Sequence, residues 1–292
     1  MGELKDNITS DFLNEINSIS FLISNNINNT AMSGNRKSKA KGNSLEFSDF
    51  RDYILGDDIR RIDWNSYARF DKLFIKVFEE EKQADVNIFI DISSSMSEQF
   101  EKSIFSRKIA LAIIYIILKN TDRVNIFTFS DDIVSKKLKL YSSSKFYDAI
   151  DFLDNVEVSG STIIKKSLTK GFFDIKNKGL SYIISDFFFE DNYKEALKFL
   201  LYKKQKVCCI QTLSKFDEEP DSYGVYGNVN LIDSESEDNN IYVNLTPLVI
   251  DEYKKNFLEF KNDINSFCKK MGIKFISVNT KEPISKIILN SL

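Results

Sequence analysis

The sequence predicts a doubly wound α/β domain built on a mainly parallel β-sheet. From Val86 onward, short apolar segments alternate with segments of helical length, beginning with the apolar run VNIFI at residues 86–90. The short segments are apolar throughout and do not alternate apolar with polar residues. Strands of this kind are buried on both faces, which is typical of a parallel sheet covered by helices.

The expected elements can be placed along the chain from these patterns. An amphipathic helix is expected first, over residues 9–29 behind a Thr9/Ser10 cap. Strands are predicted at 86–90, 123–129, 133–140, 180–185, 206–213 and 273–278, and helices at 97–119, 143–155, 162–176, 192–203, 248–271 and from Pro283. A Ser-Asp-Asp sequence separates the strands 123–129 and 133–140 and predicts a hairpin or another tight connection.

Two interruptions of this pattern suggest the domain organisation. Residues 217–245 contain two strand-like segments around an acidic turn, which predicts a small β insertion. Residues 33–44 lose all periodicity and predict a basic loop. We therefore expect an N-terminal region at 1–84, made of the helix, the loop and a motif segment, and an α/β domain at 85–292.

The composition excludes several functional classes. The chain of 292 residues has no histidine, which removes Ser–His and Cys–His dyads and His-ligated zinc. It has no phosphate-binding P-loop and no G-x-G-x-x-G motif. The net charge of −3 is spread along the chain, so we expect no nucleic-acid partner. The longest apolar run, 109–118, predicts a buried helix and no membrane span. We expect a cytoplasmic protein that is not an enzyme.

A set of oxygen-bearing side chains is predicted at one edge of the sheet. The strand 86–90 leads into Asp91, Ser93 and Ser95, Thr162 opens a later helix, and Asp186 follows the strand 180–185. A D-x-S-x-S motif alone is weak, because serine is an ordinary helix N-cap. Together, the five residues are expected at the carboxyl edge of one sheet, where ligands bind. Their hard oxygens suit Mg²⁺ or Mn²⁺.

This arrangement resembles the metal-ion-dependent adhesion site of von Willebrand factor A domains. The resemblance implies that Ser93, Ser95 and Thr162 are hydroxyl ligands and that Asp91 and Asp186 act directly or through water. It further implies an open coordination position, which an acidic side chain of a protein partner completes.

A second group of residues lies upstream of this site. It combines aromatic side chains with both signs of charge, and it contains the single tryptophan of the chain. Its arginines could pair with Asp57, Asp58 or Asp63, so the segment is either a partly buried ion-pair network or a docking surface. The candidate residues are Arg51, Tyr53, Gly56, Asp57, Asp58, Arg60, Asp63, Trp64 and Arg69.

The run FSDFRDYILGDDIRRIDWNSYARFDKLFIKVFEEEK, placed directly before D-x-S-x-S, resembles the bacterial family called domain of unknown function 58. The resemblance covers residues 34 to 292. It implies a von Willebrand factor A-like fold and a partnership with a MoxR-type AAA+ ATPase or its client.

The resulting expectation is a non-catalytic, metal-dependent protein-binding function. The alternative is a metal-dependent nuclease, because Asp63, Glu80 and Lys82 match the D…[DE]-x-K pattern of such enzymes.

Overall fold

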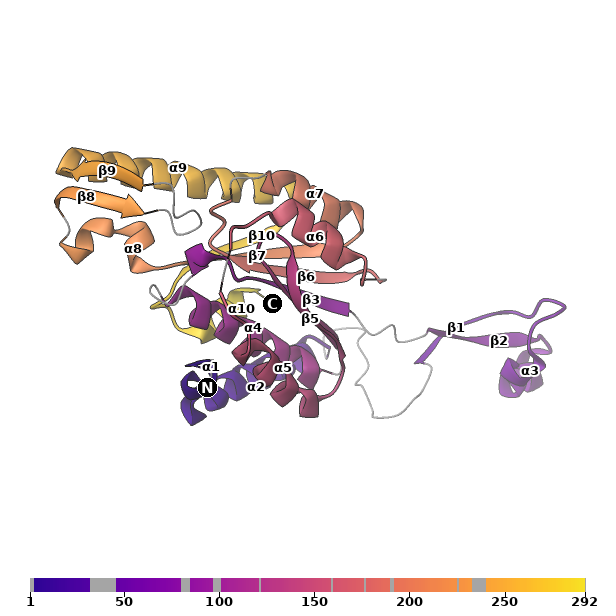
Figure 1. The fold of residues 1–292 in the computed structure, drawn as a ribbon. Helices are drawn as coiled ribbons and strands as arrows, with labels where there is room; N and C mark the ends of the chain where they lie inside the picture. Colours follow the sequence, from indigo (N-terminus) through magenta and orange to yellow (C-terminus); the bar gives the residue numbers. More distant parts are fainter. Residues whose placement is uncertain are drawn as a thin grey trace. The chain divides into compact units, whose positions relative to one another are not determined.

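The computed structural model describes residues 3–31, 46–79, 85–96, 101–120, 122–158, 160–175, 177–189, 192–224, 226–232 and 240–291 (Figure 1). The chain divides into two compact units. The larger contains residues 1–25 and 84–292, and the smaller contains residues 26–83. The basic loop predicted at 33–44 falls outside the described residues.

Within the described residues, the larger unit is built on a six-stranded sheet in the order β10-β7-β6-β3-β4-β5. Each strand pairs in parallel with its neighbour except β5, which forms an antiparallel hairpin with β4 at one edge. The predicted α/β fold with a mainly parallel sheet is confirmed, and so is the hairpin. The strands are β3 (Asp85–Asp91), β4 (Arg123–Phe129), β5 (Ile133–Leu140), β6 (Gly179–Ser185), β7 (Lys206–Leu213) and β10 (Lys274–Asn279).

Helices cover both faces of this sheet (Figure 1). Successive side chains of a strand point to opposite faces, so Ile88 and Ile90 join one core and Phe89 joins the other. The first core is formed with α1 (Glu3–Asn7), α2 (Ser10–Ala31), α4 (Lys102–Lys119), α5 (Phe146–Asp154) and α10 (Ile284–Ser291). The second is formed with α6 (Ile164–Phe172), α7 (Tyr193–Tyr202) and α9 (Pro247–Met271).

Two features of these helices bear on the predictions. The apolar run in α4 is buried as expected, apart from the half-buried Tyr115. Helix α2 places Phe12, Ile16 and Ile19 in the first core. This packing explains why residues 1–25 cluster with the α/β unit, whereas the sequence grouped them with the upstream motif.

The predicted β insertion is present between β7 and α9. It begins with a short helix α8 (Lys215–Glu218) and a 3₁₀ turn at Pro220–Tyr223. Strands β8 (Gly227–Ile232) and β9 (Asn240–Leu245) then pair with each other as a separate two-stranded sheet.

The smaller unit contains the upstream motif. Strands β1 (Glu46–Asp52) and β2 (Phe74–Glu79) form an antiparallel pair. A 3₁₀ turn at Ile59–Arg61 and a short helix α3 (Trp64–Phe70) lie between them.

Candidate functional site

The strand order creates a topological switch point at the carboxyl ends of β3 and β6. Strand β3 is followed along the chain by β4 on one side, whereas β6 is reached only after the β4–β5 hairpin and lies on the other side. In doubly wound sheets, ligands bind at such a switch point. Asp91 ends β3 and Asp186 directly follows β6, so both carboxylates lie at this place.

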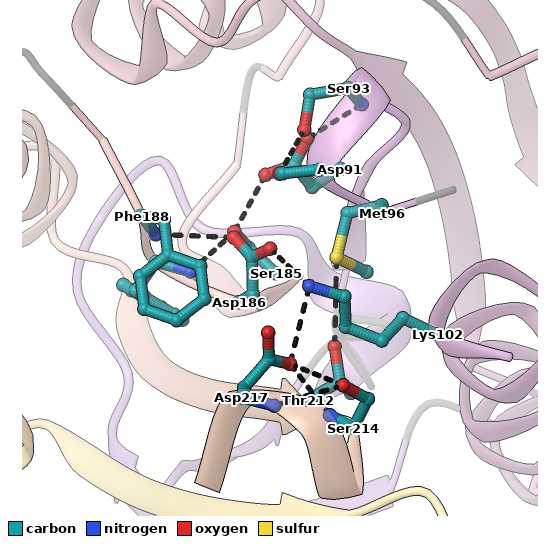
Figure 2. Close-up of polar contacts among 12 residues, drawn as sticks. Asp91, Ser93, Met96, Lys102, Ser185, Asp186, Phe188, Thr212, Ser214 and Asp217 are labelled. Carbon is teal, nitrogen blue, oxygen red and sulfur yellow. Dashed lines mark hydrogen bonds and ion pairs between the residues drawn. The ribbon is translucent and has the colours of Figure 1, made fainter. Parts of the chain in front are cut away.

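Asp91 is buried, with 2% of its surface exposed. Its Oδ1 accepts hydrogen bonds from the Ser93 N–H (3.0 Å) and from the Thr162 hydroxyl (3.2 Å). Its Oδ2 accepts a hydrogen bond from the Ser185 hydroxyl at 2.6 Å (Figure 2). Three separate segments of the chain therefore satisfy one buried carboxylate.

The predicted hydroxyl donors surround the same carboxylate. The Ser93 and Ser95 hydroxyl oxygens lie 3.0 Å apart in the turn that leaves β3. This turn is joined to the loop of Thr162 by a hydrogen bond from the Ser94 N–H to the carbonyl of Gly160 (2.9 Å). Gly160 has a φ of +80°, a conformation that favours glycine, and so lets the loop turn before α6.

Asp186 completes the set but already has a cationic partner. The Lys102 ammonium lies 2.9 Å from Asp186 Oδ2, and the Phe188 N–H donates a hydrogen bond to Oδ1 at 3.1 Å. Lys102 is 2% exposed and stands at the first residue of α4, and its Nζ also lies 3.3 Å from Asp217 Oδ2. Figure 2 shows the ammonium between these two carboxylates.

Sequence reasoning missed Lys102, Ser185 and Asp217. Lys102 gave no signal, because the sequence predicted a helix at 97–119 and so placed Lys102 beyond the first turn, whereas α4 begins at Lys102. Ser185 and Asp217 gave no signal either, since a serine in a buried strand and an aspartate at N3 of a short helix are both common.

Burial controls the charges of this site. Burial, reinforced by the charge of Asp186, raises the pKa of Asp91 to about 6. Burial also opposes the charge of Lys102, but Asp186 and then Asp217 outweigh it, so the pKa of Lys102 is raised. The site thus holds an ammonium group among three carboxylates.

The five candidate ligands have the chemistry that a small divalent cation prefers. Two carboxylates and three hydroxyls offer hard oxygen ligands. Four of the five residues are buried, Ser95 is partly exposed, and the exposed residues Gly160 and Ser161 directly precede Thr162. Among the described residues, no three His, Cys, Asp or Glu side chains form a metal-binding group. Any metal held here would therefore depend on hydroxyl ligands as well as on Asp91 and Asp186.

The charged residues of the upstream motif form separate pairs. Arg51 forms a bidentate ion pair with Asp57 (2.6 and 2.7 Å), which lowers the pKa of Asp57. Arg60 pairs with Asp58 at 3.1 Å, with 87% of the arginine side chain exposed. Within the described residues these pairs do not join into one buried network.

The other motif residues occupy different surroundings. Asp63 is buried, and it contacts Lys76 (3.3 Å) and accepts a hydrogen bond from Ser66 (2.7 Å), not from an arginine. Gly56 has a φ of +107° in the turn before Asp57. Tyr53 is half-buried, Arg69 is exposed, and Trp64 is 61% exposed with an edge contact to Tyr67.

The residues of the nuclease alternative are only partly located. Asp63 lies at the start of α3, where the ammonium of Lys76 is its cationic contact. Glu80 and Lys82 lie outside the described residues. No described contact brings a second carboxylate to Asp63.

A match to a known family model identifies the family to which this chain belongs. The family model described as "Protein of unknown function DUF58" matches residues 49–261. The chain belongs to this family. In this DUF58 chain the match begins in β1 and ends within α9, so it contains the upstream motif, all five predicted ligands and Lys102.

Several solved structures are similar to this DUF58 chain. The conserved hypothetical protein BatB from Bacteroides thetaiotaomicron is 17% identical, over 70% of this chain and 95% of that one, with a TM-score of 0.43. An aerotolerance-related membrane protein from Bacteroides fragilis is 17% identical over 71% and 98%, with a TM-score of 0.42. A von Willebrand factor type A structure from Catenulispora acidiphila is 11% identical over 48% and 35%, with a TM-score of 0.35.

No curated protein matches the DUF58 chain. In the part of the chain that the structure describes, no helix has the length and apolar character needed to cross a membrane.

The contacts of Asp63 predict its role in the smaller unit. Asp63→Ala should speed amide hydrogen exchange in β1 and β2, because it removes the link between the first turn of α3 and Lys76 of β2. Arg60→Ala is the control and should change exchange little, because exposed ion pairs contribute little to stability. Equal exchange in the two variants would show that Asp63 is not a structural link.

The raised pKa of Asp91 predicts a pH dependence of stability in the metal-free protein. Between pH 4 and 6 the folded state keeps a proton on Asp91 that the unfolded chain has lost, so this group's contribution to stability falls as pH rises through that window. Asp91→Asn removes the effect. The unfolding free energy of the variant should therefore exceed that of the wild type at pH 7, and the excess should shrink toward pH 4. Chemical denaturation at several pH values measures it, and a pH-independent difference contradicts it.

Proposed function

We propose that this chain is a non-catalytic protein-binding protein that acts through a divalent cation, Mg²⁺ or Mn²⁺, at the carboxyl ends of β3 and β6. The observation that carries the proposal is the convergence of buried Asp91 with the hydroxyl of Thr162 and the turn of Ser93 and Ser95. Asp186 lies close enough for its charge to affect Asp91. These side chains come from three segments of the chain and meet at the switch point of the sheet.

The proposed ligands are the hydroxyls of Ser93, Ser95 and Thr162 and the carboxylates of Asp91 and Asp186. Together with Asp217, these two carboxylates would balance the charges of the cation and of the Lys102 ammonium without excess. A cation bound there would supply an electrophilic coordination position for an acidic side chain of a partner protein. Such a side chain would approach past the exposed residues Gly160 and Ser161, which directly precede Thr162.

The surroundings of the site favour binding over hydrolysis. The chain has no histidine to act as a general base. Both oxygens of Asp91 accept hydrogen bonds from the protein. The hydroxyls of Ser93 and Ser95 contact each other, and the Lys102 ammonium is paired with Asp186 and Asp217 and so does not act as a base toward either serine.

The proposed partner is a MoxR-type AAA+ ATPase or its client protein. Its support is the family resemblance of the upstream motif, and the chemistry of the site adds that the contact is made by an aspartate or glutamate of the partner. The nuclease alternative has no described contact in its favour.

Metal binding can be measured on the full chain. Isothermal calorimetry should show one Mn²⁺ per wild-type chain. Asp91→Asn should weaken binding beyond the ~10–100-fold that loss of an outer-shell partner costs, because a charged ligand is removed. Asp131→Asn removes the same charge from a neighbouring exposed loop and should leave the affinity unchanged. Unchanged affinity in Asp91→Asn contradicts the proposed site.

Partner binding should depend on the same residues. A purified MoxR-type ATPase should bind the wild type in Mg²⁺, and Thr162→Ala should weaken this binding by removing one ligand without changing the charge. Thr169→Ala, in the neighbouring helix α6, is the matched control. Equal binding by the wild type and Thr162→Ala contradicts the mode of contact. Mg²⁺-dependent DNA or RNA cleavage that Glu80→Ala abolishes and Asp91→Asn does not would establish the nuclease alternative.

A further inference from the structure

Lys102 is held in place by groups from two other parts of the larger unit, the segment after β6 and helix α8. It begins α4, its Nζ lies 2.9 Å from Asp186 after β6, and 3.3 Å from Asp217 in α8. The same Nζ lies 5.5 Å from the centroid of the Phe188 ring. With 2% of its surface exposed, the ammonium is shielded from water and depends on these groups for its stabilisation.

Asp217 is fixed independently of the candidate metal site. Its Oδ2 accepts hydrogen bonds from the N–H (2.8 Å) and the hydroxyl (2.9 Å) of Ser214, and the Ser214 hydroxyl in turn accepts from the Asp217 N–H. This reciprocal capping box anchors the first turn of α8. The hydroxyl of Tyr253 in α9 also donates to the Asp217 carbonyl at 2.8 Å.

Asp186 therefore stands between two possible cations. One of its oxygens faces the Lys102 ammonium and the other accepts a hydrogen bond from the Phe188 N–H. The preceding residue, Ser185, donates its hydroxyl to Asp91, which places Asp186 next to the carboxylate that the hydroxyl donors surround. A divalent cation among those donors would share Asp186 with the ammonium. Two positive charges on one buried carboxylate repel each other strongly, because the low dielectric of the interior screens them poorly.

We infer that Lys102 sets the metal affinity of the site by competing with the divalent cation for Asp186, and that Asp217 limits this competition by holding the ammonium toward α8. The inference rests on the proposed metal-dependent function and names the residues that regulate it. Without metal, the ion pair with the ammonium holds the Asp186 carboxylate in position. With metal, Asp217 remains as a carboxylate partner for Lys102.

The two residues give opposite predictions for Mn²⁺ binding to the full chain. Lys102→Met should tighten binding by about tenfold or more, since it removes a positive charge beside the metal while keeping the length and apolar stem of the side chain. Asp217→Asn should weaken binding, because the ammonium then turns more fully to Asp186. In the Lys102→Met background, Asp217→Asn should have a smaller effect, and this coupling isolates the contact between the two residues.

Two control variants separate charge from packing and position. Lys119→Met removes the same charge from the far end of α4 and should leave the affinity unchanged. Lys102→Arg keeps the charge and should not tighten binding. A second readout is the rise in melting temperature on adding Mn²⁺, which should be larger for Lys102→Met than for the wild type, since the metal then compensates a carboxylate that has lost its ammonium.

Each outcome decides between the inference and the proposed function. Equal affinities of the wild type and Lys102→Met overturn the inference and leave the metal site standing. Binding by Lys102→Met alone supports the competition between Lys102 and the metal, and it contradicts the proposed metal-dependent function of the wild type. Absence of binding in both overturns both proposals. Should Lys102→Met fail to fold, Asp217→Asn still decides, because unchanged affinity in that variant contradicts the role of Asp217 and the competition it limits.

Discussion

Burial of β3 on both faces is the constraint on which the site depends. The strand is buried from Asp85 to Asp91, and its backbone polar groups pair with β4 and β6. It delivers Asp91 to a place that water does not reach freely, and a carboxylate there requires hydrogen-bond donors. The donors come from the turn after β3, the loop before α6 and the end of β6. One buried carboxylate therefore organises the loops at this edge of the sheet.

The carboxylates at the ends of β3 and β6 also require a balancing positive charge. Asp186 adds a negative charge near Asp91, and the buried ammonium of Lys102 forms an ion pair with Asp186. A buried ion pair contributes little net stability, because desolvation of both charges opposes their attraction. Here the ion pair fixes the position of Asp186 at the carboxyl end of β6. The Lys102 ammonium also contacts Asp217 in α8. The candidate metal site and the start of the β insertion are therefore linked through this one side chain.

The upstream motif follows a different physical rule. Its ion pairs are local in sequence and largely exposed, so they define the turn between β1 and α3 and do not form a buried network. Asp63 is the exception, because it is buried and bridges α3 and β2. Large apolar side chains nevertheless remain outside, with Leu55 95% exposed and Phe70 66% exposed. The motif thus combines a locally stabilised turn with an exposed apolar surface.

The sequence by itself determined the α/β fold, the edge hairpin of β4 and β5, the β insertion and the oxygen donors at the ends of β3 and β6. It could do so because periodicity records which faces are buried, and because the carboxyl ends of parallel strands share one edge. The secondary structure of the upstream motif and the Lys102–Asp186–Asp217 cluster emerged only from the tertiary structure. The three members of the cluster are far apart in the chain, 84 residues separating Lys102 from Asp186. Their meeting depends on how α4, β6 and α8 pack together, which no local pattern encodes.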